Sequence, residues 1–424
     1  MGGEVKNMRG LLGAVVVILV VAGCGKAAAP PVTGGDFMLY EAATTNSSQL
    51  VAVIGTRSQS VERTLPWGAL DGKHLYSVRN TTLSDIDPLT GSTTRTLRLP
   101  YNFQLPMVTA SGIAGGLSQN GRWLVLSHQP DQIDTFGSHM MVVDTSLMKT
   151  AVPVDLQGSF QFDAISNDGQ RIYMIEYLSG ANYRVRMYNV AAHQLDPTIV
   201  VDKSDPKEAM TGIRLSGVAS PDGQWLYSVY VRPNKGAFIH ALNLNQPYAF
   251  CLELPGAGYQ SGAPDELQWS LALSADGSQL FAANGAMGIV TDIHNDGNAP
   301  PSVTRTVHVG TSTASAGGLV KDVEAKEFGS GGAVLSPDGK TLVMTAKTGL
   351  AWVDTATLHV RSRHLTDWTV WSLGLSPDGS MVYALSDNQK IAELSMANPG
   401  APTTFSASPA QPLGLIRVES APAP

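Results

Sequence analysis

The chain has 424 residues, with 28 Lys and Arg, 35 Asp and Glu and a formal net charge of −7. This acidic balance argues against a nucleic-acid-binding protein, because neutralisation of backbone phosphates dominates that kind of binding. Only 15% of the residues are charged, whereas Gly and Pro number 43 and 25, which predicts many turns between short buried strands.

The first 23 residues predict a secretory signal. Lys6 and Arg9 precede an apolar run from Leu11 to Ala22, and small residues lead to Cys24. The run is too short to span a bilayer comfortably, since a spanning helix needs about 20 apolar residues. The stretch before Cys24 resembles the bacterial lipoprotein signal, which implies that Cys24 is acylated. A plain signal peptide or an uncleaved anchor with an incidental cysteine is the alternative.

The lipoprotein resemblance implies a location in the bacterial cell envelope, either on the outer face of the cytoplasmic membrane or in the outer membrane. Residues 24–35 are rich in Ala, Pro and Gly and predict a flexible tether. We expect the folded domain over residues 36–419 and a disordered tail over residues 420–424. Three strand-like runs follow the tether, at Phe37–Tyr40, Leu50–Ile54 and Val61–Leu65.

A short turn motif recurs along the rest of the chain. In its full form it reads Ser-Pro-Asp-Gly, where Pro suits the second position of a type I turn and Gly the position that needs a positive φ. Such a turn joins two antiparallel strands. The copies begin at Ser118, Ser166, Ser220, Ser274, Ser336 and Ser376, and a further Asp71-Gly72 lacks the Ser.

Each turn is flanked by strand-like runs. A short apolar run precedes the turn and a Tyr- or Val-rich run follows it, as at Leu373–Leu375 and Val382–Leu385. A third run ends in an acid or amide, as at Trp352–Asp354 or Thr291-Asp292, and a fourth is polar, as at Thr93–Leu97. Four antiparallel strands per repeat, arranged radially, predict an all-β propeller.

The blade count depends on the two ends of the chain. Seven repeats are centred on turns, and the N-terminal runs make three strands without an innermost strand. The C-terminal run Pro412–Glu419 can supply that strand and close the ring, which gives eight blades. Seven blades with irregular terminal segments are the alternative.

The repeats resemble those of Tyr-Val-Thr-Asn-type and lactonase-like propellers, with kinship to the Ser-Pro-Asp-Gly repeats of TolB-like propellers. The resemblance covers about residues 36–419, and it implies the fold while saying little about function. Lactonase-like propellers and quinoproteins hold ligands at the central channel with polar residues from several blades, a set that this sequence alone does not identify. The chain has no Gly-x-Ser-x-Gly, His-Glu-x-x-His or P-loop motif, which argues against the corresponding enzymes.

A polar insertion offers one candidate metal site. It contains His128, Asp131, Asp134 and His139, which are residue types that bind divalent metals. Their spacing matches no standard site, and a solvated polar loop is the competing and preferred interpretation. Of the two cysteines in the chain, Cys251 lies in a strand-like run after Phe250, and we expect a buried, inert thiol there.

A second candidate site depends on two tryptophans at equivalent positions. Trp269 and Trp371 each lie five residues before the Ser of a turn, so we expect both at the start of an innermost strand, at the channel mouth opposite the hairpins. Aromatic rings beside acids can stack on a sugar or hold a cation. Ordinary packing between blades is the alternative. The candidate ligand-binding residues are Asp265, Glu266, Trp269, His364, Asp367, Trp368 and Trp371, and the long loop Thr311–Gly332 is expected on the same face.

Two functions remain open. The preferred one is a lipid-anchored, monomeric binding or scaffold module that holds a protein, peptide or glycan at the channel mouth, without a cofactor. The alternative is a propeller enzyme, a lactonase-like hydrolase or a quinoprotein-like oxidoreductase, with its site in the channel. Convergent His, Arg or acidic side chains around a deep channel would favour the enzyme, whereas a mouth ringed by aromatic residues and loops would favour the binding module.

Overall fold

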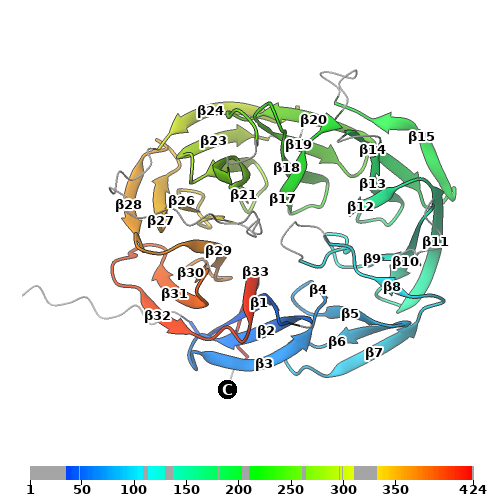
Figure 1. Cartoon of the computed structure of the whole chain (residues 1–424), viewed down its shortest axis with the longest axis horizontal. Helices are drawn as coiled ribbons and strands as arrows, with labels where there is room; N and C mark the ends of the chain where they lie inside the picture. Colours follow the sequence, from blue (N-terminus) through cyan, green and yellow to red (C-terminus); the bar gives the residue numbers. More distant parts are fainter. Residues whose placement is uncertain are drawn as a thin grey trace, which may run out of the picture. The chain divides into compact units, whose positions relative to one another are not determined.

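The described part of the chain forms eight antiparallel sheets set radially around a central axis, as Figure 1 shows. The structure is a computed structural model, and it describes residues 35–46, 48–107, 113–128, 137–178, 182–202, 210–259, 264–295, 297, 299–309 and 332–422. The predicted signal, Cys24, Asp131, Asp134 and residues 311–331 of the long loop lie outside these ranges. The predicted all-β propeller is confirmed.

Each sheet is one blade, and we number the blades in chain order. From the innermost strand outward, blade 1 contains β4 (Ala69–Leu70), β5 (Leu75–Arg79), β6 (Thr82–Ile86) and β7 (Thr93–Arg98), and blade 2 contains β8 (Phe103–Gln104), β9 (Trp123–His128), β10 (Gly137–Asp144) and β11 (Lys149–Gln157). Blade 3 contains β12 (Phe160–Ile165), β13 (Arg171–Tyr177), β14 (Asn182–Asn189) and β15 (Gln194–Val200), and β16 (Met210–Thr211) also pairs with β14. Blade 4 contains β17 (Ile213–Ala219), β18 (Trp225–Val231), β19 (Ala237–Asn243) and β20 (Tyr248–Glu253).

The second half of the ring repeats this order. Blade 5 contains β21 (Trp269–Leu273), β22 (Gln279–Asn284), β23 (Ile289–His294) and β24 (Ser302–His308), and blade 6 contains β25 (Ala333–Leu335), β26 (Thr341–Thr345), β27 (Leu350–Asp354) and β28 (Val360–His364). Blade 7 contains β29 (Val370–Leu375), β30 (Met381–Ser386), β31 (Lys390–Ser395) and β32 (Thr403–Ser406). Blade 8 contains β33 (Gln411–Ser420), β1 (Phe37–Thr44), β2 (Gln49–Gly55) and β3 (Ser60–Pro66). β23 runs to His294, two residues beyond the predicted end at Asp292.

Blade 8 joins the two ends of the chain. β33 pairs antiparallel with β1, from Phe37 opposite Ser420 to Thr44 opposite Gln411. β1 is buried along most of its length, so it needs a strand on each side to bond its backbone groups. The closure predicted from the C-terminal run is confirmed, and the seven-blade alternative is wrong.

The Ser-Pro-Asp-Gly turns are hairpins held by a local set of hydrogen bonds. The Ser336 backbone N–H donates to Thr341 O at 2.8 Å, and the Ser336 carbonyl oxygen accepts from Gly339 N at 2.8 Å. The Ser336 hydroxyl donates to the Asp338 carboxylate at 2.7 Å and accepts from Thr341 N at 2.9 Å. The same set of bonds recurs at Ser166, Ser220, Ser274 and Ser376, and at Ser118 the Asn120 side-chain oxygen takes the place of the carboxylate.

Neighbouring hairpins also contact one another around the ring. Asn120 N donates to Asn167 Oδ1 at 2.9 Å, and Asn167 Nδ2 donates to Asp222 O at 3.1 Å. Gly379, at φ +69°, leaves room for the neighbouring Pro337, since a Cβ there would lie 2.0 Å from the proline ring. We call this end of the ring the hairpin face and the opposite end the mouth face.

Apolar side chains between adjacent blades form the core. The cluster between blades 3 and 4, for example, contains Tyr173, Val185, Tyr230 and Leu242, all at most 2% exposed. The single helical turn among the described residues is the 3₁₀ turn η1 (Pro264–Leu267) before blade 5. In the described ranges, no helix has the length and apolar character that a membrane span requires.

Candidate functional site

The two tryptophans predicted to share the mouth face lie in different environments. Trp269 pairs in register with Asn284, is 3% exposed and packs in the core of blades 4 and 5. Trp371 instead lies in a β-bulge, between the pairs Val370–Ser386 and Ser372–Leu385. The bulge turns its indole toward β33, where Nε1 donates to Leu413 O at 3.3 Å. Trp269 therefore lines no surface, and Trp371 is partly covered.

The acids before blade 5 mainly hold the backbone in place. Glu266 is 8% exposed, and its Oε1 accepts from Ala257 N at 2.8 Å. The Asp265 carbonyl accepts from Asn284 Nδ2 at 2.8 Å, while its carboxylate lies 3.9 Å from Lys347 Nζ. Of this pair, only Asp265 presents a charge to solvent.

The residues before blade 7 are also largely structural. The His364 ring packs edge-on against Trp352, with centroids 5.0 Å apart, and its Nε2 lies 2.9 Å from Ser362 Oγ. Burial lowers the pKa of His364. Trp368 packs partly buried among the side chains of blades 6 and 7, and Asp367 is exposed. Of the predicted acids and tryptophans, Trp269 and Glu266 are thus buried, whereas Asp265, Asp367, Trp368 and Trp371 reach solvent to different extents.

A cavity in blade 2 brings together the two described histidines of the polar insertion. The rings of His128 and His139 are 5.9 Å apart and nearly perpendicular, at 86°. The cavity has a volume of about 390 Å³. We call it the blade-2 pocket, and its lining residues are Tyr101, Phe103, His128, His139, Met140, Met141, Pro153 and Asp155.

The blade-2 pocket opens on the mouth face. β9 starts at the Ser118 hairpin and ends at His128, so His128 lies at the far end of the blade. His139 Nδ1 lies 2.6 Å from Asp155 Oδ1, and the two residues face each other across the β10–β11 ladder. His128 Nδ1 is buried, and no hydrogen-bond partner for it is found in the described chain. Tyr101, at the rim, is 66% exposed.

Only part of the candidate metal site lies in the described ranges. His128 and His139 come together as that prediction requires, while Asp131 and Asp134 lie outside the description. Within the described residues, no three His, Cys, Asp or Glu side chains are placed to hold a metal ion. Sequence reasoning missed Tyr101 and Asp155, because the β10–β11 register and the path before β8 place them there.

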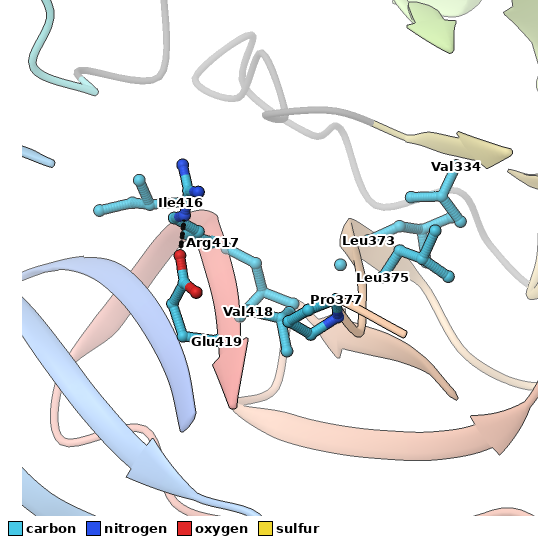
Figure 2. Close-up of a pocket in the computed structure, with 10 residues that line it drawn as sticks. Val334, Leu373, Leu375, Pro377, Ile416, Arg417, Val418 and Glu419 are labelled. Atoms are coloured by element: carbon cyan, nitrogen blue, oxygen red, sulfur yellow. Dashed lines mark hydrogen bonds and ion pairs between the residues drawn. The ribbon is translucent and has the colours of Figure 1, made fainter. Parts of the chain in front are cut away.

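The channel wall near the ring closure is mostly aliphatic. A cavity of about 320 Å³ lies between β29 and β33. Figure 2 shows the side chains that line it, such as Leu373, Leu375 and Val418. Its charged groups are Arg417 and Glu419, which form an ion pair with each other. This wall offers little polar chemistry to a substrate.

The channel wall on blades 1 to 4 carries one buried ion pair. A cavity of about 210 Å³ is lined by Asp163 and Arg214 among small and apolar residues. Arg214 Nη1 lies 2.5 Å from Asp163 Oδ1, and the Asp163 side chain is 1% exposed. Burial acts to lower the pKa of Arg214, but Asp163, Tyr230 and Tyr183 outweigh this effect and raise it. The guanidinium lies over Gly217, where a Cβ would come within 2.9 Å of Arg214 Nη2.

Cys251 is half-buried rather than fully buried as predicted. It lies in β20 at the outer edge of blade 4, and its Sγ is 3.7 Å from His240 Nδ1. Burial lowers the pKa of His240 to about 4, so the imidazole is uncharged at neutral pH and does not stabilise a thiolate. This environment agrees with the predicted inert thiol.

Comparison with known proteins supports the fold alone. No protein-family model matches the chain, and no curated protein matches it. Among solved structures, the dihydro-haem d1 dehydrogenase NirN is similar with a TM-score of 0.53 and 12% identity, over 90% of this chain and 74% of NirN. The periplasmic gluconolactonase PpgL of Pseudomonas aeruginosa has a TM-score of 0.46 and 19% identity, over 92% of this chain and 100% of PpgL.

Proposed function

We propose that this chain is a monomeric, lipid-anchored β-propeller of the cell envelope that binds its ligand on the mouth face. In this proposal Cys24 carries the lipid, and the repeats are of the Tyr-Val-Thr-Asn type. The observation that carries the proposal is the blade-2 pocket, which has the size of a small-ligand site and an exposed Tyr101 at its rim.

The hairpin face is a poor alternative. The serines, acids and backbone groups of its turns bond to one another, both within a hairpin and between some neighbouring hairpins. Variable loops on a rigid scaffold are where binding residues usually concentrate, and the connections of the mouth face vary more in length than the hairpins do.

A second candidate function is an enzyme with its site in the channel. The observation that favours it is the Asp163–Arg214 pair in the wall of the smaller channel cavity. A buried arginine can hold a developing negative charge on a substrate. However, Asp163 already neutralises Arg214, and the wall shown in Figure 2 is aliphatic. Among the described residues that line these two channel cavities, Asp163–Arg214 and Arg417–Glu419 are the charged groups, and each is paired internally.

Two variants distinguish a binding site in the blade-2 pocket from an enzyme site in the channel. Tyr101→Ala removes the exposed ring of the blade-2 pocket, and Arg214→Met removes the charged group of the channel. We expect Tyr101→Ala to weaken the binding of envelope glycans or peptides at least tenfold on defined arrays, while Arg214→Met leaves it unchanged. Loss of binding only in Arg214→Met would favour the channel site instead.

The proposed anchor is tested separately. Cys24→Ser should abolish acylation, measured by incorporation of a radiolabelled fatty acid, and release the chain from membrane fractions. If the variant remains in the membrane after a carbonate wash, the apolar run Leu11–Ala22 is the anchor.

A further inference from the structure

We infer that the blade-2 pocket holds an uncharged pyranose ring, stacked on Tyr101 and hydrogen-bonded by Asp155. This inference rests on the proposed function and names its ligand class. It draws on four features of the pocket, which are its size, its backbone pairing, its charge and its ring geometry.

Size favours a single ring. Small-molecule pockets commonly measure roughly 300–1,000 Å³, and this cavity of about 390 Å³ is near the lower end of that range. The floor is apolar, with Phe103, Met140 and Met141 at most 7% exposed. A pocket of this size suits one sugar unit, as at the end of a glycan, better than a folded partner.

The pairing of the backbone argues against an extended peptide. A peptide that adds to a sheet needs unpaired N–H and C=O groups along an edge. Here Phe103 pairs with His128, His139 with Asp155 and Met141 with Pro153, and the outer edge of the blade is β11. On that edge Pro153 has no N–H to donate to an added strand. Recognition in this pocket therefore depends on side chains.

The charge of the pocket argues against ions. Among the described residues that line it, none is Lys or Arg, so nothing basic offsets the charge of a phosphate or carboxylate. The Asp155 carboxylate would repel such an anion. Of the lining residues that the structure describes, Asp155 alone would offer a carboxylate to a bound cation, and it is already bonded to His139. An uncharged ligand with hydroxyl groups fits best.

The ring geometry favours one-sided stacking. Phe103 and His128 lie against Tyr101 at interplanar angles of 58° and 78°, so neither forms a parallel slot that would clamp a flat base. Tyr101 remains 66% exposed, with area free for the C–H face of a sugar.

Polar groups stand beside this aromatic surface. The Asp155 side chain is 69% exposed and can accept from a sugar hydroxyl, while it also bonds to His139 Nδ1 at 2.6 Å. The His128 and His139 rings form the wall beside it, with their centroids 5.9 Å apart.

Isothermal titration calorimetry of the full chain tests the inference. The chain is purified in a detergent without a sugar headgroup and titrated with a panel of methyl pyranosides, a sugar phosphate, adenosine and a short peptide pool. We expect an uncharged pyranoside to bind, with the affinity reduced at least tenfold by Tyr101→Ala and by Asp155→Asn. Tyr101→Phe, which keeps the ring, should remain within threefold of the wild type.

The matched control is Tyr177→Ala. Tyr177 is 50% exposed and ends β13, the strand that corresponds to β9 in the next blade, but it does not line the pocket. Its removal should leave pyranoside binding unchanged, and melting temperatures of all variants check that each is folded. Pyranoside binding that survives Tyr101→Ala would overturn the inference.

The outcomes separate the inference from the proposed function. Binding of adenosine or peptide, but of no pyranoside, with loss in Tyr101→Ala, would overturn the sugar and leave the mouth-face site standing. Binding that is lost only in Arg214→Met would overturn both. If none of the probes binds, the inference of a pyranose site is wrong.

Discussion

On the hairpin face, six turns spread over most of the chain use the same set of hydrogen bonds, from Ser118 to Ser376. On the mouth face, two tryptophans at the same offset from their turns lie in different places, because Trp371 is in a bulge and Trp269 is not. The hairpins need only neighbours within a few residues, whereas the environment of a side chain on the mouth face depends on how whole strands pair.

The same contrast appears in the acids. A hydrogen bond from the Ser274 hydroxyl, helped by the Ser278 backbone and hydroxyl, lowers the pKa of Asp276 on the hairpin face to about 2. Glu41, in β1, is fully buried beside Ser408 in the β32–β33 connection, and burial raises its pKa to about 7. Local hydroxyl donors therefore govern one carboxylate and tertiary burial governs the other.

Truncating each tryptophan to alanine is the strongest test of the difference between their environments. Trp269→Ala should lower the free energy of unfolding by about 4 kcal/mol, the typical loss for a buried aromatic residue. Trp371→Ala should lose roughly half as much or less, since the bulge leaves its ring partly exposed. Urea denaturation followed by far-ultraviolet circular dichroism measures both, and equal losses would contradict the difference in environment.

The pH dependence of stability tests the two kinds of acid. The pKa of Glu41 is raised from its ordinary 4.5 to about 7 in the folded state, so stability is full below pH 4.5 and is lost as the pH rises through 7. The loss is about 3 kcal/mol by pH 8, at roughly 1.4 kcal/mol per pKa unit.

Glu41→Gln is the matched variant for this measurement and should remove the decline between pH 4.5 and 8. Asp276 acts with the opposite sign, since its lowered pKa stabilises the fold above pH 3.8 and this contribution disappears as the pH falls through 2. A decline that persists in Glu41→Gln would assign it to another group.

Two glycines, Gly379 and Gly339, test the contact between neighbouring hairpins. Gly379 and Gly339 have nearly the same φ, +69° and +70°, but a Cβ at Gly379 would meet Pro337 at 2.0 Å whereas one at Gly339 would meet nothing within 4 Å. The backbone strain of either Gly→Ala change should be about 1–2 kcal/mol. Overpacking against Pro337 should lower the free energy of unfolding of Gly379→Ala by about 2 kcal/mol more.

A second substitution should restore the stability that Gly379→Ala loses, as measured by chemical denaturation. Adding Pro337→Ala to Gly379→Ala should bring its stability back to the level of Gly339→Ala, because the preceding hairpin of Gly339 carries the small Ala275 at the corresponding position. No rescue would mean that the neighbouring hairpin is not the cause of the loss.

The smallest expected effect concerns the turn serines. Ser336→Ala and Ser376→Ala each remove a hydroxyl that accepts from a backbone N–H and donates to the turn Asp. Each should lose about 1 kcal/mol, the net contribution of such a bond. The stability losses of the two variants, measured by thermal unfolding, should agree closely. Clearly different losses would show that the hairpins are not equivalent.

Sequence reasoning located the strands well and the candidate site poorly. The turn at Ser336 was anticipated, and the ring closure by Pro412–Glu419 was one of two alternatives. His128 and His139 were candidate metal ligands, but a solvated polar loop was the preferred interpretation. The joint site of acids and tryptophans did not form as one surface, since Trp269 and Glu266 are buried. Tyr101 and Asp155 carry no local signal, because only the β10–β11 register and the fold before β8 bring them to the pocket.

The sequence by itself determined the blades, because a Ser-Pro-Asp-Gly hairpin and its flanking strands are specified by residues a few positions apart. It also predicted a closure of the ring by the C-terminal run but left seven blades open, and the pairing of β33 with β1 decided between them. Tertiary structure alone decided which mouth-face side chains reach solvent. A one-residue bulge changes the environment of an aromatic ring, and the approach of neighbouring blades decides whether a carboxyl such as Glu41 is buried.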